Sequence, residues 1–178
     1  MAKRLLDCTA SELAAFSKKD LLESMAGCEG RVMVSETIGI TQPLLNDVTN
    51  AEYAAALGAD VLLLNMFDVQ QPVVQALPKV APEETVRELK RLTGRVIGIN
   101  LEPVDPVLAA SNDGTLWQMS AGRLATSENA VKAADMGVDM VLLTGNPGNG
   151  VANEAIVAAL REMKAAAGDR LILPPARC

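Results

Sequence analysis

Short apolar runs alternate with amphipathic stretches along most of the 178-residue chain. The apolar runs lie at residues 31–36, 60–65, 95–100, 139–144 and 170–173. Continuous runs of this kind are typical of strands in a parallel sheet whose two faces are both covered by helices. The pattern therefore predicts about five parallel strands.

The stretches between these runs carry the start and stop signals of helices. They cover residues 50–58, 82–94, 126–137 and 153–168, and each of them ends on a glycine. A glycine after the last helical residue adopts the left-handed backbone that caps many helix C-termini. The regular order predicts a (βα) repeat over residues 31–178.

Two short helices are predicted before the first strand, within residues 1–30. Thr9 or Ser11 can cap the first helix, Ser17 precedes the second, and Gly27 closes it. We interpret residues 1–30 as an N-terminal helical cap.

One segment of the chain is repeated. The sequence NAEYAAALGADVLLL at residues 50–64 aligns without gaps with NAVKAADMGVDMVLL at residues 129–143. Any amphipathic helix followed by a glycine and a buried strand produces a similar pattern. In either case the alignment supports repeated βα units.

Two architectures accommodate five strands with intervening helices. A doubly wound sheet would be complete at this length, whereas a TIM barrel needs about 250 residues. The N-terminal helices could close the bottom of a barrel, and the repeat implies sequential strand neighbours. We therefore expect a partial TIM-barrel-like α/β fold. Polar residues also collect where the predicted strands end, at Glu36, Asn65, Asn100, Glu102, Thr144 and Asn146.

The final residues, LILPPARC, are a poor continuation of a βα unit because proline cannot donate to a strand ladder. Either this strand ends the fold or the barrel is truncated, and we expect truncation. A truncated barrel exposes a strand edge, so we expect a homo-oligomer.

Composition and charge exclude several classes of protein. A net charge of −6 argues against sequence-independent nucleic-acid binding, which needs clustered basic residues. No signal peptide or membrane-spanning apolar run is present, and the three cysteines suit reduced thiols, so we expect a cytoplasmic protein without membrane partners. The chain has no histidine, which excludes Ser–His–Asp and Cys–His catalysis.

The sequence TGNPGNG at residues 144–150 is the strongest local signal for a binding site. Several glycines allow backbone N–H groups to approach an anion, and the helix that follows offers its positive end. An ordinary βα turn is the alternative. The residues that we expect to hold an anionic small molecule are Thr144, Gly145, Asn146, Gly148 and Asn149.

Acids and amides follow the earlier strands as well. Glu36 closes the first strand, Asn65 and Asp68 follow the second, and Asn100 and Glu102 lie at the end of the third. Such oxygen-rich groups could bind hydroxyls or Mg²⁺, although the sequence identifies no metal. A solvated residue or a turn cap is the alternative for each acid.

Four segments resemble a family of uncharacterised bacterial TIM-barrel proteins that are often found beside sugar phosphotransferase-system genes and are sometimes labelled phosphonomutase-like. They are SKKDLLESMAGCEGRVMVSE, ADVLLLNMFD, GRVIGINLEPVD and GVDMVLLTGNPGNGV. The resemblance extends to about Ile172, beyond which family members continue for longer. It implies a barrel with a phosphorylated or sugar-derived ligand.

Together these patterns favour an enzyme of lyase or isomerase type that acts on a small phosphorylated or sugar-derived metabolite. Glu36 or Glu102 would be the general base, and Asn65 and Asn100 would orient hydroxyl groups. The alternatives are a non-catalytic metabolite-binding or regulatory protein linked to sugar uptake, or an inactive barrel fragment.

Overall fold

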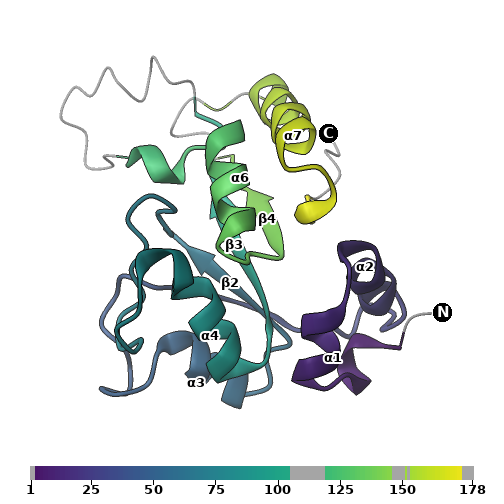
Figure 1. The fold of residues 1–178 in the computed structure, drawn as a ribbon, viewed down its shortest axis with the longest axis vertical. Coiled ribbons are helices and arrows are strands. Elements are labelled where there is room, and N and C mark those ends of the chain that lie inside the picture. The colour runs from purple at the N-terminus through teal and green to yellow at the C-terminus, as the bar shows by residue number, and fades with distance from the viewer. Residues whose placement is uncertain (1–2, 105–118, 146–150, 152, 174–178) are drawn as a thin grey trace.

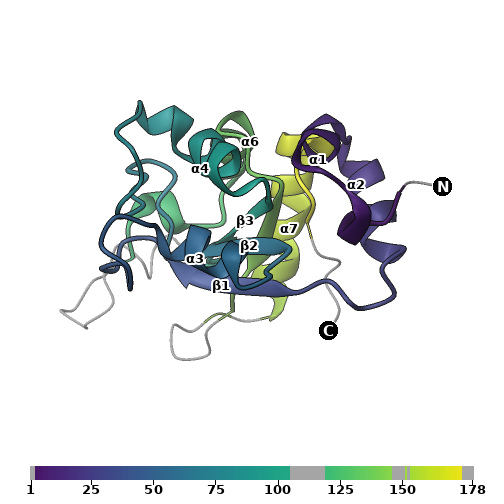
Figure 2. The same cartoon turned by 90° about the horizontal axis from the view of Figure 1, so that it is seen from below.

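Four parallel strands form the sheet of the computed structural model, which describes residues 3–104, 119–145, 151 and 153–173. They are β1 (Val34–Ile38), β2 (Val61–Asn65), β3 (Val96–Leu101) and β4 (Met140–Leu143). The strands lie side by side in the order β1-β2-β3-β4. Figure 2 shows β1 at one edge, followed by β2 and β3. The prediction of a parallel α/β fold is confirmed. The sequential order has no reversal point, which a doubly wound sheet would require.

The fifth predicted strand, at residues 170–173, is only an isolated bridge between Ile172 and Met140. The N–H of Ile172 donates to the carbonyl of Asp139 at 2.8 Å, and Val141 donates to the carbonyl of Ile172 at 2.9 Å. A 3₁₀ helix, η5 (Gly168–Arg170), occupies the residues just before this bridge. The described residues therefore confirm four of the five strands, because η5 takes up the start of the fifth. Residues 174–178, which carry the predicted truncation, lie outside the described residues.

Helices connect the strands and cover one face of the sheet (Figure 1). Alternate strand residues, among them Leu62, Leu64, Ile97 and Ile99, point to this face and form the main apolar core with the helices. Pro82 starts a short 3₁₀ turn, η2 (Pro82–Glu84), directly before the second of these helices. The four predicted connecting helices are confirmed as α3 (Asn50–Ala56), α4 (Thr85–Thr93), α6 (Ser127–Asp135) and α7 (Asn153–Ala167).

The two predicted N-terminal helices are α1 (Ala10–Ala15) and α2 (Lys18–Ala26). Thr9, rather than Ser11, caps α1, and its side chain and that of Glu12 each bind the other residue's backbone N–H. Ser17 caps α2 in the same way, and Gly27 ends that helix. Such reciprocal caps let helices of six and nine residues form, although helices this short are marginal in isolation.

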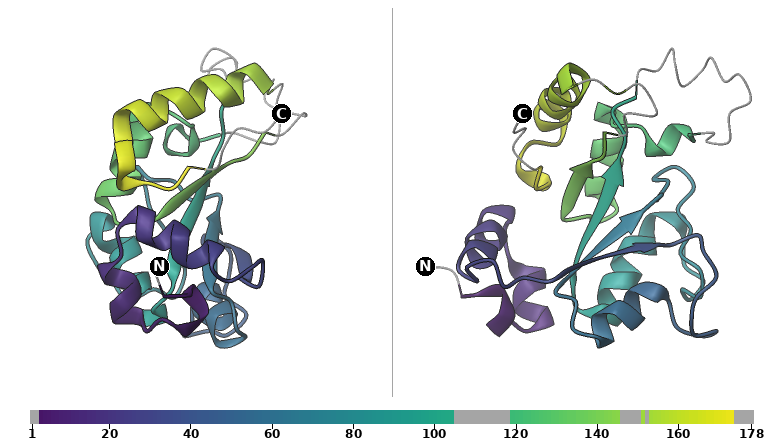
Figure 3. Two further views of the ribbon diagram at one scale, coloured as in Figure 1. Left: turned by 90° about the vertical axis from the view of Figure 1, so that its right-hand side faces the viewer. Right: turned by 180° about the vertical axis from the view of Figure 1, so that it is seen from behind.

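A second apolar cluster joins these helices to the sheet. Leu5, Leu21 and Cys28 pack against Val61 and Val96, which begin β2 and β3 and point away from the main core. In Figure 3, α2 lies close to the end of α7, and η5 contacts α2. The N-terminal helices therefore cover the edge at which the strands begin, which we call the amino edge.

The internal repeat of the sequence is also a repeat of backbone structure. Gly58 and Gly137 follow α3 and α6 with φ angles of 102° and 91°. The residues after them donate to equivalent helix carbonyls, Ala59 to Ala54 at 3.1 Å and Val138 to Ala133 at 3.0 Å. Both helix–strand units therefore end their helix with the same glycine-dependent turn.

Candidate functional site

Polar side chains from neighbouring strands meet at the edge where the strands end, which we call the carboxyl edge. Ile38 of β1 pairs with Asn65 of β2, so Glu36, two residues earlier, lies on the same face as Asn65. Asn100 of β3 lies on this face as well, because the pairing of Leu63 with Gly98 continues in the same register. Thr144 follows the last residue of β4. We call Glu36, Asn65, Asn100 and Thr144 the polar row.

Hydrogen bonds join the polar row from one side of the sheet to the other. Asn65 donates through Nδ2 to Glu36 Oε1. The backbone N–H of Met66 donates both to Asn65 Oδ1 at 2.7 Å and to Asn100 Oδ1 at 3.0 Å. Asn100 in turn donates through Nδ2 to Thr144 Oγ1 at 3.3 Å. Both amides thus point their oxygen toward the N–H of Met66. The nitrogen of Asn65 points toward Glu36, and that of Asn100 points toward Thr144.

Met66 adopts an unusual backbone conformation for a side chain of its size. Its φ angle is 57°, in the left-handed region that residues other than glycine seldom occupy. This conformation costs about 1–2 kcal/mol. It turns the N–H of Met66 toward the two asparagine oxygens, so the hydrogen bonds of the row compensate for the strain.

The polar row becomes less exposed from β1 toward β3. Glu36 is exposed, Asn65 and Thr144 are partly buried, and Asn100 is 5% exposed. Each asparagine has a second amide N–H, and Thr144 has a hydroxyl hydrogen, that make no bond with the described residues. The row can therefore offer several donors to a ligand beside one accessible carboxylate.

The second acid proposed as a general base, Glu102, lies in a different environment from Glu36. Its carboxylate pairs with the guanidinium of Arg123, and the two side chains are 8% and 15% exposed. The backbone holds the same two residues together, because the N–H of Glu102 donates to the carbonyl of Arg123 at 2.9 Å. An arginine partner keeps the carboxylate of Glu102 engaged, so Glu36 is the better placed of the two acids to accept a proton from a ligand.

Asp68 lies in a turn after β2 and is not part of the polar row. Its Oδ1 accepts the backbone N–H groups of Gln70 at 2.7 Å and Gln71 at 3.0 Å. A Cβ at Gly122 would lie 1.7 Å from the same oxygen, so only glycine fits at this position. Asp68 therefore holds the loop after β2 against the loop that carries Arg123.

The glycine-rich segment after β4 is described only at its start. Among its predicted binding residues, Thr144 belongs to the polar row, whereas Asn146, Gly148 and Asn149 lie outside the described residues. A Cβ at Gly145 would lie 2.8 Å from Cδ1 of Ile156, in the first turns of α7. The chain therefore passes close to the N-terminal part of α7 directly after Thr144.

The three acids that could bind Mg²⁺ do not come together among the described residues. Glu36 is bound to Asn65, Asp68 to its own turn, and Glu102 to Arg123. Within these parts of the chain, no group of three or more acids or cysteines is close enough to hold a metal ion. Likewise, no described helix has the length and apolar character needed to cross a membrane.

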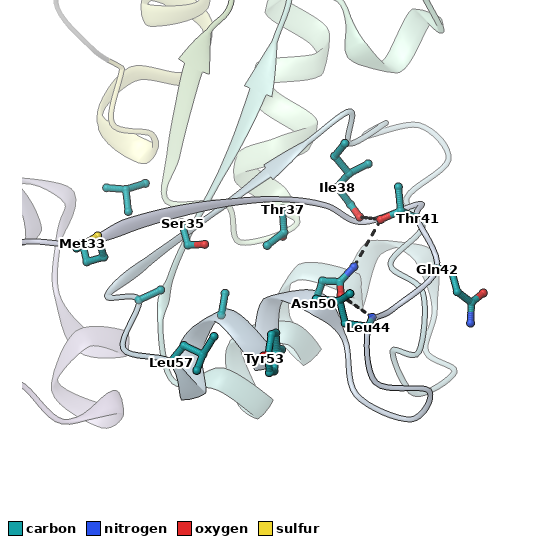
Figure 4. Close-up of a pocket in the computed structure, with 13 residues that line it drawn as sticks. Met33, Ser35, Thr37, Ile38, Thr41, Gln42, Leu44, Asn50, Tyr53 and Leu57 are labelled. Atoms are coloured by element: carbon teal, nitrogen blue, oxygen red, sulfur yellow. Dashed lines mark hydrogen bonds between the residues drawn. The ribbon is translucent and has the colours of Figure 1, made fainter.

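A groove of about 550 Å³ lies between β1 and α3, and no residue of the polar row lines it (Figure 4). Its walls are mainly apolar, with Met33 and Ile38 on the strand side and Tyr53 and Leu57 on the helix side. None of its lining residues is charged, so the groove does not suit an anionic ligand.

Two features of the candidate site have no signal in the sequence. The left-handed conformation of Met66 and the pairing of Glu102 with Arg123 both depend on contacts between different strand ends.

Comparison with known proteins adds a family but no activity. The model of a family described as Domain of unknown function (DUF7916) matches residues 6–176. No curated protein matches the sequence.

Proposed function

The chain belongs to the DUF7916 family, and we propose that it binds a small phosphorylated or sugar-derived metabolite at the polar row. The observation that carries this proposal is the hydrogen-bonded row itself, which gathers one carboxylate, two amides and one hydroxyl from four successive strand ends. In parallel α/β folds, ligands bind beyond the carboxyl ends of the strands.

The donors and acceptors of the row suit a polyhydroxylated ligand with an anionic group. Asn65 and Asn100 are fixed by Met66, so their remaining N–H groups are oriented before a ligand arrives. The hydroxyl of Thr144 and the positive end of α7 would favour a phosphate or carboxylate.

We propose a lyase or isomerase reaction in which Glu36 removes a proton from the bound metabolite. Glu36 is exposed, and Asn65 fixes one of its oxygens, which leaves the second oxygen for a substrate C–H or O–H. An oriented carboxylate of this kind is a suitable general base in a protein without histidine.

We further propose that the sheet is part of a TIM-barrel-like fold. The sequential parallel order, the helices on one face and the N-terminal helices at the amino edge are what a segment of such a barrel requires. This agrees with a polar row at the carboxyl edge, where barrel enzymes place their active sites.

Calorimetric titration with a panel of sugar phosphates and triose phosphates tests the proposed binding. Asn100→Ala removes the central member of the row and should weaken binding at least tenfold, the loss expected for a hydrogen bond of about 1.4 kcal/mol. Asn46→Ala, an exposed asparagine outside the row, is the matched control and should bind like the wild type. Equal affinity in all three proteins would exclude the polar row as the binding site.

Glu36→Gln separates catalysis from binding. Glutamine keeps an oxygen for Asn65 but cannot accept a proton, so binding should persist while turnover, or exchange of substrate hydrogen with solvent, is lost. Saturable binding without turnover in the wild type would instead favour a metabolite-binding or regulatory protein.

Finally, we propose that copies of the chain associate through the groove beside β1. β1 is an edge strand, because it pairs only with β2 among the described strands. The exposed side chains of Met33, Leu44 and Leu57 line the groove beside it. Two copies that each carry a charge of −6 can approach most easily through an uncharged surface. Light scattering over a concentration series should give a dimer for the wild type and a monomer for Leu57→Lys; a wild-type monomer throughout would refute the association.

A further inference from the structure

A small cavity at the amino edge is separate from the polar row and from the groove beside β1. Its volume is about 60 Å³, and it lies between α1, α2 and the end of α4. Apolar side chains of α1 and α2 form one side, and Lys90, Arg95 and Asp139 contribute to the other. We call it the amino-edge cavity. A single water needs about 10–15 Å³ of such a volume, so an ion of a few heavy atoms fits.

The charges around the amino-edge cavity do not balance. Asp139, whose side chain is 8% exposed, accepts from Lys90 Nζ at 2.7 Å and from Lys18 Nζ. The same carboxylate also accepts the backbone N–H of Ile97 at 2.9 Å. Two lysines therefore share this one carboxylate, and Arg95 adds a third positive side chain to the lining of the cavity, within a protein whose net charge is −6.

Arg95 is the cation of this group that lacks a hydrogen-bond acceptor and an ion-pair partner among the described residues. Its side chain is partly buried, and its Nε is buried without any hydrogen-bond acceptor among the described residues. The guanidinium also makes no ion pair with a carboxylate in the described ranges. Arginine remains charged inside proteins, so this donor cannot adapt by losing its proton, and leaving it without a partner is unfavourable.

We propose that the amino-edge cavity binds a small monovalent anion of a few heavy atoms, such as formate or bicarbonate, between Arg95 and Lys90. The anion accepts from Lys90 Nζ and from the terminal N–H groups of the Arg95 guanidinium, and it supplies one of the negative charges that Asp139 alone cannot provide. Such charge-assisted hydrogen bonds are the strong ones in proteins. The bound anion fills the space between α1 and α2 on one side and the end of α4 on the other.

The state of Lys90 agrees with this site. Burial lowers the pKa of Lys90 in spite of the neighbouring Asp139. A cation that is still destabilised beside its carboxylate is stabilised further by a second negative charge.

The test compares the thermal unfolding of the protein in sodium formate and in sodium gluconate at equal ionic strength, because gluconate is too large for a cavity of about 60 Å³. Formate should raise the unfolding temperature and should slow amide exchange in α1. The gain in unfolding free energy should follow RT ln(1 + [L]/Kd), so it should grow with the logarithm of the formate concentration above Kd. Arg95→Gln should weaken formate binding tenfold or more and abolish both effects.

The control is Arg91→Gln, in the last turn of α4, where the arginine pairs with Glu88 and is 66% exposed. This variant should respond to formate as the wild type does. Asn100→Ala should also respond fully, which distinguishes the anion site from the metabolite site at the polar row. If Arg95→Gln does not fold, Arg95→Lys replaces it, with a weakened formate response expected. An equal response in the wild type and in either Arg95 variant would overturn the proposal.

Discussion

The two helix–strand units α3–β2 and α6–β4 have similar sequences and the same backbone turn, yet they differ in what surrounds one shared aspartate. Asp60 accepts the N–H of Met33 at 2.8 Å, and Asp139 accepts the N–H of Ile97 at 2.9 Å. Each aspartate therefore ties the start of its own strand to the preceding strand. Asp139 alone of the two is also bound by two lysines, Lys18 and Lys90.

This difference shows how one local motif acquires two energetic roles. Asp60 is partly exposed and needs only its backbone contact. Asp139 is buried where α2, α4 and β4 meet, so its charge must be matched by distant side chains. The repeated sequence sets the backbone role of the aspartate, and its position in the sheet sets its electrostatic role.

The largest predicted effect comes from removing each aspartate. Asp139→Ala leaves two lysines and a buried N–H without their partner and should lower the free energy of unfolding by about 3 kcal/mol. Asp60→Ala removes one hydrogen bond at a partly exposed position and should lower it by about 1 kcal/mol. Urea unfolding measures both, with Asp169→Ala as control because that side chain is 97% exposed. Equal losses at positions 60 and 139 would show that the lysines contribute nothing.

The two helix-ending glycines should show a smaller difference. Gly58 and Gly137 both have positive φ, so alanine at either position should cost about 1 kcal/mol. At Gly137 the added Cβ also lies 3.3 Å from Cγ of Arg87, whereas nothing lies within 4 Å at Gly58. Gly137→Ala should therefore be slightly the more destabilising in chemical denaturation. Gly27→Ala, at a φ of −63°, is the control and should be nearly neutral.

Removing the N-cap of α3 and removing that of α6 should change the free energy of unfolding by amounts that differ by less still. Thr49 and Glu52 form a reciprocal cap on α3, whereas Thr126 only accepts the N–H of Asn129 on α6. We expect Thr49→Ala to cost about 1 kcal/mol and Thr126→Ala about 0.5 kcal/mol in unfolding experiments. The reverse order would mean that Glu52 does not strengthen the cap.

The smallest predicted effect is a pH dependence that arises from Lys90 of α4, which pairs with the aspartate of the α6–β4 unit and not with that of the α3–β2 unit. Burial lowers the pKa of Lys90 in the folded protein, so the unfolded chain binds the proton up to higher pH. Between the folded pKa and the unfolded value of 10.5, stability should therefore rise with pH. The unfolding free energy of the wild type minus that of Lys90→Gln should therefore increase as the pH approaches 10.5. Lys19→Gln, at an exposed lysine, should show no such trend, and a shrinking Lys90 difference would contradict the buried cation.

Much of the fold could be predicted from the sequence because its signals are local. Glycines at positions 58, 94 and 137 mark where three helices end, and Ser17 and Gly27 mark the limits of α2. The predicted fifth strand at residues 170–173 was not confirmed, because Arg170 ends η5 and only Ile172 pairs with β4, as an isolated bridge. The hydrophobic period and the helix-capping residues of a sequence do not show whether a helical turn or a short strand will form at such a position.

The candidate site could be predicted only in part. Glu36, Asn65, Asn100 and Thr144 were expected at the strand ends, and the parallel register brings them together. Asp68 and Glu102 were expected beside them, but a local turn and Arg123 engage these two acids elsewhere. A spacing of residues places a side chain at a strand end, whereas its partner depends on the neighbouring loops.

The sequence by itself determined the parallel α/β class, the helix limits and the repeated helix–strand unit, because backbone preferences and hydrophobic period act over a few residues. Only the tertiary structure decided that Lys18 and Lys90 meet Asp139, contacts that span 121 and 49 positions of the chain. It likewise decided that the N–H of Met66 lies between Asn65 and Asn100. Contacts at such separations follow from how the elements pack on the sheet, and no local pattern encodes them.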